Sequence, residues 1–308
     1  MSGPARPTPD HSAVARPEWL SERGREIYGR TPPGQSVPVA RLSALDQGEV
    51  DEVVTLIAEG RTARHTVVLP ERLKTRDWTS VTRVSLALVD RLGRLGWEGY
   101  GWKIGAASEV IRRAEGVPSP SAGRIHRRGL ASSPGTLPAD LFVNYRNCEC
   151  EFAFELGVDF PPRDQPWTEA DARAGIESVM PALEIGDTVF EDWYGASGFF
   201  GSCLDNGGAA AFVEGPKHLD WRQFDLSLTG MDVYLNGYYV KSGIGAAAMG
   251  HPVTSLTWLL NWLREQSLGT MAGEVVSTGT CTGHLFALPG DTVRAEFPEL
   301  GTVEANFL

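Results

Sequence analysis

The sequence predicts an α+β protein in which helices come first and a sheet-rich region follows. Apolar residues recur at helical spacing between residues 43 and 98, whereas from Gly99 onward glycines become frequent and short alternating runs appear. Of the 308 residues, 42% are hydrophobic and 22% are charged, which is enough apolar material for a folded core. We therefore expect one large domain with an N-terminal extension, since domains commonly hold ~100–200 residues.

Residues 1–40 differ from the rest in composition. They are rich in Pro, Gly, Arg and Ser and lack sustained periodicity, so we expect a mobile or wrapping arm. They hold no apolar stretch typical of a secretion signal, and no run in the chain approaches the ~18 apolar residues of a membrane span. The four cysteines show neither a disulfide framework nor paired zinc spacing. We expect a cytoplasmic protein with reduced, buried thiols.

Residues 41–98 predict an N-terminal helical region. The first helix is expected to begin after Ser43 or Asp46 and to stop near Gly60, and the second to begin after Thr75. Each shows an apolar stripe with a period of three to four residues. The stripes consist of Val50, Val53, Val54 and Ile57 in the first helix, and Trp78, Val81, Leu88 and Leu92 in the second.

Residues 99–308 contain the predicted sheet. The run CECEFAFEL at 148–156 alternates as a strand does. Thr168 and Asp171 resemble a capping box, which predicts a helix that starts there and continues through Val179.

The C-terminal third supplies a hairpin, a helix and closing strands. Asn236-Gly237 lies between β-formers, and both central positions of a type I′ turn require positive φ, so this pair predicts a tight hairpin. Residues 255–265 predict an apolar-rich helix. Residues 289–293 and 301–307 predict turns and strands at the end of the chain.

The charge balance and the absent motifs exclude several functions. Lysines and arginines number 28 against 39 acidic residues, a formal net charge of −11, which repels a phosphate backbone. The sequence holds no GxxxxGK[ST] loop, no GxGxxG after a strand, no HExxH and no GxSxG. We expect neither nucleic acid nor a membrane as a partner, and a small molecule as the substrate.

Two glutamates in the 148–156 run are candidates for metal chemistry. Residues two apart on a strand share a face, so Glu149 and Glu151 point the same way. Adjacent like charges on an otherwise apolar strand need a counter-charge, which a hard divalent cation supplies. Glu155 continues the same face, so the alternative of a solvent-facing edge strand stays open.

Four further residues are candidates, each with a simpler alternative. Glu184 stands in an apolar context after the predicted helix; it is either paired or metal-bound, or part of a salt bridge at a helix end. Lys103 is flanked by apolar residues; a dry pocket or a nearby cation would lower its pKa for acid–base work, and the alternative is a surface lysine. Asp205 opens a functional loop or a plain turn. His284 faces a site or is structural.

Several ordered segments together resemble one family. They are GWKIG at 101–105, ECEFAF at 149–154, PALEI at 181–185, Asp205-Asn206, a glycine-spaced run from Gly243 to Pro252, and Pro289-Gly290-Asp291. Over residues 45–308 this set resembles the fumarylacetoacetate hydrolase superfamily, and within it the branch of 2-keto-4-pentenoate hydratases and 4-oxalocrotonate decarboxylases. Each motif alone is weak, and their shared order carries the resemblance.

The resemblance implies a fold, a metal site and an assembly. Residues 99–308 would form the catalytic domain around a mixed, rolled sheet, with residues 41–98 as its N-terminal helical region, in a homodimer or larger homo-oligomer. Lys103 would move protons, and Asp205 or His284 would orient a water molecule. The implied ligands of Mg²⁺ or Mn²⁺ are Glu149, Glu151 and Glu184.

Two segments depart from the pattern of the branch. Residues 117–123 lack the acidic residues usual there, and residues 186–190 lack an arginine that often follows the PALEI segment. These departures spare the implied metal ligands and are expected to alter the pocket wall. The substrate is therefore less constrained than the metal chemistry.

The resulting hypothesis is a metal-dependent lyase that hydrates a 2-hydroxydienoic or 2-oxo-enoic acid through an enolate stabilised by the metal. Decarboxylation of a 4-oxalocrotonate-like 2-oxo diacid is the nearest alternative, since the same enolate would accept the electrons. A C–C bond hydrolase and a non-catalytic binding protein on the same fold are further alternatives.

Overall fold

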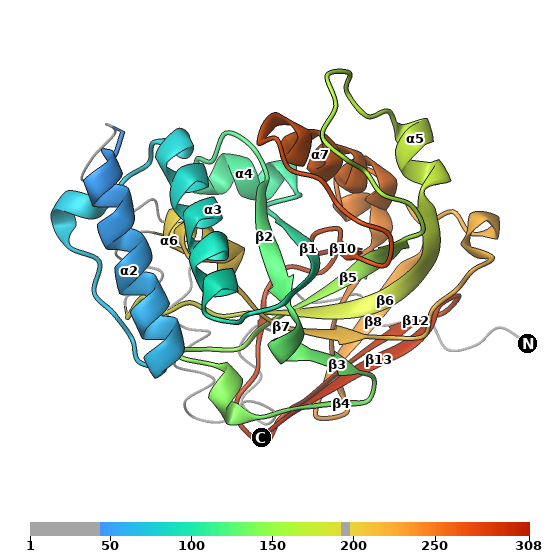
Figure 1. The fold of residues 1–308 in the computed structure, drawn as a ribbon. Helices are drawn as coiled ribbons and strands as arrows, with labels where there is room; N and C mark the ends of the chain where they lie inside the picture. Colours follow the sequence, from blue (N-terminus) through green and yellow to red (C-terminus); the bar gives the residue numbers. More distant parts are fainter. Residues whose placement is uncertain (1–43, 192–197) are drawn as a thin grey trace, which may run out of the picture.

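Two mixed β-sheets that share an apolar core form the centre of the protein (Figure 1). The computed structural model describes residues 44–191 and 198–308, so the predicted arm at 1–40 lies outside the described residues. Phe152 and Phe297 come from different sheets, and their rings meet edge to face with centroids 5.4 Å apart. The predicted α+β class is confirmed, and the sheets are mixed and curled.

Both sheets combine strands that are consecutive in the chain with strands that are far apart in it. Within the described residues, the eight-stranded sheet has the order β2 (Ser121–His126), β1 (Gly99–Gly105), β10 (Val275–Ser277), β5 (Asn147–Leu156), β6 (Ile176–Gly186), β7 (Ala209–Glu214) and β3 (Leu130–Ser132), with β11 (Leu285–Phe286) paired to β5. The five-stranded sheet has the order β4 (Gly135–Leu137), β13 (Gly301–Phe307), β12 (Thr292–Phe297), β8 (Gly230–Leu235) and β9 (Tyr238–Ile244).

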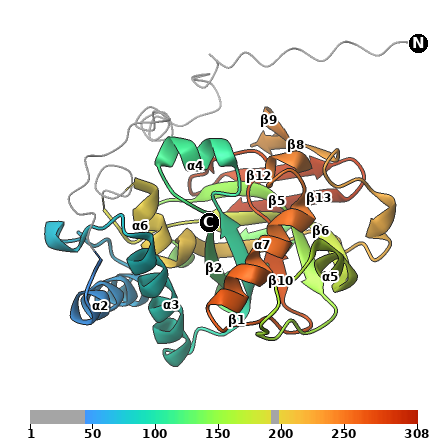
Figure 2. The same cartoon turned by 90° about the horizontal axis from the view of Figure 1, so that it is seen from above.

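Helices flank the sheets in two groups, as Figure 2 shows. On one side lie α2 (Gln47–Ala63), α3 (Trp78–Arg94) and α6 (Gly198–Leu204), which share a second apolar cluster. On the other side lie α5 (Glu169–Ala174) and α7 (Pro252–Glu265), and α4 (Glu109–Glu115) follows β1. Short 3₁₀ turns occupy Glu71–Leu73, Arg127–Gly129, Ala139–Leu141, Asn206–Gly208, Trp221–Gln223 and Gly245–Ala247. None of the helices in the described part of the chain is both long and apolar enough to cross a membrane.

The first predicted helix starts as expected but ends later. Asp46 and Glu49 form a capping box at the start of α2. The helix continues past Gly60 to Ala63, and Arg64 ends it in the left-handed conformation. Gly60 is a packing residue rather than a stop, because a Cβ there would lie 3.0 Å from the Val67 side chain.

The helix predicted from Thr168 through Val179 is wrong in its second half. Its capping box is present, but α5 ends at Ala174 and residues 176–186 form the buried strand β6. Pro181 is tolerated in this strand because pairing with β7 begins only at Ala182. Glu184 therefore lies within a central strand rather than beyond a helix end.

The predicted hairpin is confirmed. Asn236 and Gly237 adopt φ values of 53° and 81° between β8 and β9, as a type I′ turn requires. The strand at 148–156 is confirmed as β5, and the helix predicted at 255–265 begins three residues earlier, at Pro252.

His126, at the end of β2, makes stability depend on pH. It is buried against Trp97, and burial together with the charge of Arg124 lowers its pKa to about 4. In the unfolded chain this histidine binds its proton near pH 6.5. Its contribution to the free energy of unfolding is therefore fully present above that pH and is lost as the pH drops toward 4. We expect about 2 kcal/mol to be lost between pH 7 and pH 5 through this residue. Urea unfolding of the wild type and His126→Gln at both pH values measures it, and an identical pH dependence in the variant would refute it.

Candidate active site

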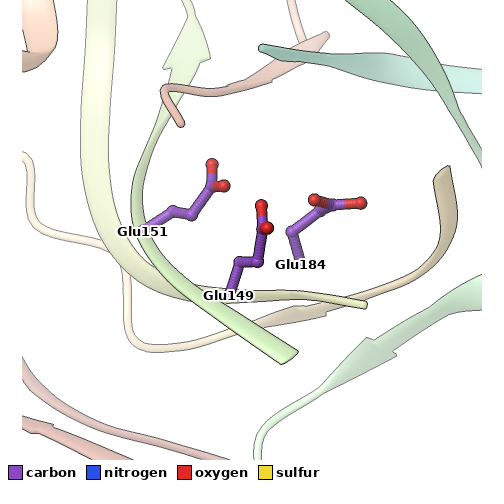
Figure 3. A group of neighbouring side chains, drawn as sticks. All are labelled: Glu149, Glu151 and Glu184. Carbon is purple, nitrogen blue, oxygen red and sulfur yellow. The ribbon is translucent and has the colours of Figure 1, made fainter. Parts of the chain in front are cut away.

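Three buried glutamates meet where β5 and β6 pair (Figure 3). Glu149 and Glu184 are directly opposite in the register, and Glu151 lies two residues along β5 on the same face. One carboxylate oxygen from each residue lies within 4.8 Å of the others. Since β5 lies between β10 and β6, the alternative of a solvent-facing edge strand is wrong.

The carboxylates have unused hydrogen-bonding capacity. Glu151 Oε2 accepts bonds from Ser277 Oγ at 2.6 Å and from the Gly279 amide at 2.7 Å. In contrast, Oε1 of Glu151 and Oε1 of Glu184 are buried without a hydrogen-bond donor. Buried oxygens of this kind are costly unless a cation faces them. Oxygen ligands in this number suit a hard divalent cation, so the residues present fit a metal ion.

The ammonium group of Lys103, on β1, lies next to this triad. Its Nζ lies 3.1 Å from Glu184 Oε2, and the side chain is buried, so the alternative of a surface lysine is wrong. Burial alone would lower its pKa, but attraction to Glu184 and Glu149 outweighs burial and raises the pKa above its usual value. The carboxylates therefore oppose the lowering that a dry pocket by itself would cause.

The three glutamates of the triad differ in pKa. Burial opposes ionisation of Glu149, yet the hydrogen bond from His284 and the charge of Lys103 lower its pKa to about 2. Burial and the Glu149 charge raise the pKa of Glu184 to about 7, against the opposing effect of Lys103. Burial followed by repulsion from Glu184 and Glu149 raises the pKa of Glu151 well above its usual range. With all three ionised, one lysine cannot balance the charge, which is the electrostatic case for a divalent cation.

His284 and Asn147 complete one side of the site. His284 Nδ1 lies 3.0 Å from Glu149 Oε1, and its side chain is 49% exposed. Asn147 Nδ2 lies 2.8 Å from His284 Nδ1 and donates to Glu149 Oε1 at 3.0 Å. The structure therefore brings the predicted His284 to the triad. Asn147 is not among the residues predicted from the sequence, although its position two residues before Glu149 on one strand face could have indicated it.

A cavity lies beside Glu149, Glu184, Lys103 and His284. Its walls come from β1, β5, β6, β11, α4, α6, the 3₁₀ turn at Asn206–Gly208 before β7, and the loop between β10 and β11. The described residues that line it are Lys103, Gly105, Ala106, Ile111, Tyr145, Asn147, Glu149, Glu184, Gly186, Phe199, Ser202, Gly207, Gly208, Thr280, His284 and Phe286. Of the two departing segments expected to alter the wall, only Gly186 is among these residues.

Asp205 is not among the residues that line the cavity, contrary to the expectation that it orients a water molecule. Its carboxylate is fully buried and binds Arg61 Nε at 2.9 Å and Arg61 Nη2 at 2.8 Å. It also accepts bonds from Thr188 Oγ1 and the Val189 amide, each at 2.8 Å. These contacts fix the chain that leaves β6, so the geometry gives Asp205 a supporting position behind the cavity.

A curled mixed sheet that carries buried carboxylates and a lysine at one cavity is a site whose residues fit a metal ion and a small-molecule ligand. Comparison with known families identifies the family of the chain. The sequence profile described as fumarylacetoacetate (FAA) hydrolase C-terminal matches residues 126–308. The chain belongs to the fumarylacetoacetate hydrolase family, and the resemblance found from the motifs is confirmed.

Relatives narrow the chemistry. The chain is 30% identical over 213 residues to the 2-keto-4-pentenoate hydratase of Paraburkholderia xenovorans, covering 69% of this chain and 77% of that protein. It is 30% identical over 138 residues to the 4-oxalocrotonate decarboxylase of Pseudomonas putida, covering 45% and 52%. The solved 4-oxalocrotonate decarboxylase of Pseudomonas putida G7, complexed with magnesium and adipate, superposes with a TM-score of 0.78 at 23% identity, covering 87% of this chain and all of that one. The last comparison establishes the shared fold.

Proposed function

We propose that this chain is a divalent-metal-dependent lyase that hydrates a 2-oxo-enoic acid, reached from its 2-hydroxydienoic tautomer. The observation that carries the proposal is the triad of Glu149, Glu151 and Glu184, in which carboxylate oxygens lack donors. Glu149 and Glu184 line a cavity together with Lys103 and His284. Similarity to a 2-keto-4-pentenoate hydratase over 69% of the chain supports the reaction class.

Each residue has a proposed task. Glu149, Glu151 and Glu184 would hold Mg²⁺ or Mn²⁺, which when bound would supply Lewis-acid polarisation of a chelating 2-oxo acid. Lys103 carries the mobile proton, since its ammonium is buried at the triad and faces the cavity. His284, half exposed at the cavity, orients the water that adds to the conjugated double bond. Asp205 supports the chain behind the cavity through Arg61.

Decarboxylation of a 2-oxo diacid is the second candidate. The relative named 4-oxalocrotonate decarboxylase favours it, over 45% of this chain. Supplying 2-hydroxypent-2,4-dienoate and 4-oxalocrotonate in parallel, and measuring the 4-hydroxy-2-oxo product against released CO₂, separates the two reactions. A C–C bond hydrolase would instead release two fragments from a diketo acid.

The test of the proposed site is calorimetric titration of Mg²⁺ into metal-free protein, with and without oxalate. Oxalate is planar and chelating, as the enolate of a 2-oxo acid is. We expect Mg²⁺ binding that tightens when oxalate is present and that disappears in Glu149→Ala. Absence of Mg²⁺ binding, or binding indifferent to oxalate, would refute the metal-dependent function and favour a binding protein on this fold.

Lys103 gives a separate prediction for the chemical step. Lys103→Met should lower turnover by at least about 100-fold, the usual range for a lost general acid or base. Binding of Mg²⁺ with oxalate should persist, because the three carboxylates remain. Lys217→Met, which removes a half-exposed lysine paired with Glu155, is the matched control and should keep full turnover. Full turnover in Lys103→Met with metal bound would eliminate the proton-transfer role.

We also propose that the chain is cytoplasmic and assembles as a homodimer or larger homo-oligomer. The edge strand β9 exposes Tyr238 and Tyr239, which supports association through this side of the molecule. Sedimentation equilibrium of the full chain tests the assembly, and a monomer at micromolar concentration would contradict it.

A further inference from the structure

We propose that the cavity selects 2-oxo acids with an uncharged, apolar tail and rejects diacids, and that Ile111, Phe199 and Phe286 determine this selection. The inference rests on the proposed function, because it concerns the part of the substrate that extends beyond the group held at the metal site. The evidence is the apolar character of the side chains that border that site and the lack of a free lysine or arginine among the described ones.

Phe199 borders the site directly. A Cβ placed on Gly105 would lie 3.6 Å from Phe199 Cζ and 3.7 Å from Lys103 Nζ. The ring of Phe199 and the ammonium of Lys103 therefore approach the same point of the cavity wall, beside Gly105. A tail that extends from an acid end beside Lys103 toward α6 would contact Phe199.

Phe286 forms a second apolar border, next to the triad. Its ring stacks on His284 at a centroid distance of 6.2 Å and meets Tyr145 edge to face at 5.6 Å. Ile111, from α4, and Ala106 also line the cavity. Apolar surface thus lies beside both the Lys103 side and the His284 side of the metal site, and it would gain free energy by covering a hydrocarbon tail.

The described lining of the cavity offers no free lysine or arginine for a second carboxylate. Among its described lining residues, Lys103 is the only lysine or arginine, and it is paired with Glu184. Arg112 follows Ile111 in the chain, but it does not line the cavity and its Nη1 donates to the carbonyls of Ala106 and Ala107, each at 2.8 Å. The remaining polar groups away from the triad are the neutral hydroxyls of Tyr145, Ser202 and Thr280.

A charged tail would therefore lose its hydration without a partner. An isolated carboxylate is far more costly to bury than a methyl group, and the nearby triad adds repulsion. Neutral hydroxyls can bind a hydroxyl group or a water molecule on the tail, as the hydration of a double bond requires, but they cannot balance a negative charge.

Three ligands of the Mg²⁺-loaded protein separate the tail from the acid end: pyruvate, 2-oxohexanoate and 2-oxoadipate. Pyruvate measures the acid end alone. 2-Oxohexanoate and 2-oxoadipate have equal length and differ in a terminal methyl or carboxylate group. We expect 2-oxohexanoate to bind at least ten-fold more tightly than pyruvate, since each buried methylene contributes about four-fold. We expect 2-oxoadipate to bind at least ten-fold more weakly than 2-oxohexanoate.

Ile111→Arg and Phe199→Arg test two of the three residues named. Each places a cation on the apolar wall and should reverse the preference toward 2-oxoadipate, with pyruvate binding kept within about three-fold. Leu219→Arg adds the same charge at an exposed position that does not line the cavity, and it should change nothing.

The outcomes distinguish a failure of the proposed function from a failure of the proposed selection for an apolar tail. If pyruvate fails to bind the Mg²⁺-loaded protein, the proposed function itself is refuted. If pyruvate binds and 2-oxoadipate binds the wild type as tightly as 2-oxohexanoate, the function stands and the selection for an apolar tail is overturned. If the wild type shows the selection but neither arginine variant shifts it, Ile111 and Phe199 are not its determinants.

Discussion

Glu151→Gln is expected to abolish Mg²⁺ binding while leaving the metal-free protein at least as stable as the wild type. Glutamine has nearly the same shape, and its carbonyl oxygen can still accept the hydrogen bond from the Gly279 amide. Burial and the neighbouring carboxylates raise the pKa of Glu151, so at neutral pH folding must either take up a proton or bury a repelled charge, and glutamine removes that cost. Removing only an outer partner of a metal ligand costs 10–100-fold in affinity, and removal of the ligand itself should cost more than about 100-fold. Calorimetry with Mg²⁺ and urea unfolding of the metal-free protein measure the two effects.

Glu155→Gln is the matched control for this experiment. Glu155 lies on the same strand and face, but its carboxylate binds Lys217 and Ser178 instead of joining the triad. Its replacement should leave the Mg²⁺ affinity unchanged. Wild-type Mg²⁺ affinity in Glu151→Gln would remove Glu151 from the ligand set. A loss of about 2 kcal/mol or more in the free energy of unfolding of metal-free Glu151→Gln would instead show that the Glu151 carboxylate stabilises the metal-free fold.

The strand carboxylates could be predicted because their geometry is local. A period of two residues places Glu149 and Glu151 on one face of any strand, whatever its neighbours. Glu184 was found through its apolar context, although the helix expected before it was wrong. The capping box at Thr168 set the start of α5 correctly, but nothing local fixed its end, and the pairing of residues 176–186 with β5 and β7 decided the conformation there.

The rest of the site depends on contacts between distant parts of the chain. His284 reaches Glu149 because β11 pairs with the start of β5, a register that no local pattern reports. The role of Asp205 depends on Arg61, which lies 144 residues earlier in the sequence. A sequence motif marked Asp205 as notable, but only the structure shows that its carboxylate is turned away from the cavity and toward α2.

Arg61→Met is expected to destabilise the protein strongly while leaving the metal ligands intact. Arg61 is 5% exposed and binds both Asp205 and Asp187. Removing its charge leaves two fully buried carboxylates without their cation, and breaking a buried pair in this way costs about 3–5 kcal/mol. Asp187 in turn accepts hydrogen bonds from the amides of residues 143–145, which lead into β5. Urea unfolding of the metal-free protein measures the loss.

Arg64→Met provides the comparison, since it makes the same substitution three residues later in an exposed pair with Asp140. Exposed ion pairs contribute about 0–1 kcal/mol, so the two variants should differ by several-fold in their effect. If Arg61→Met also costs less than about 1 kcal/mol, Asp205 and Asp187 do not depend on Arg61 for their stability in the fold. If it costs the expected amount, α2 holds the chain on both sides of the triad in place through a single guanidinium group. The N-terminal helices are then part of what shapes the active site, even though none of the described residues that line the cavity belongs to α2 or α3.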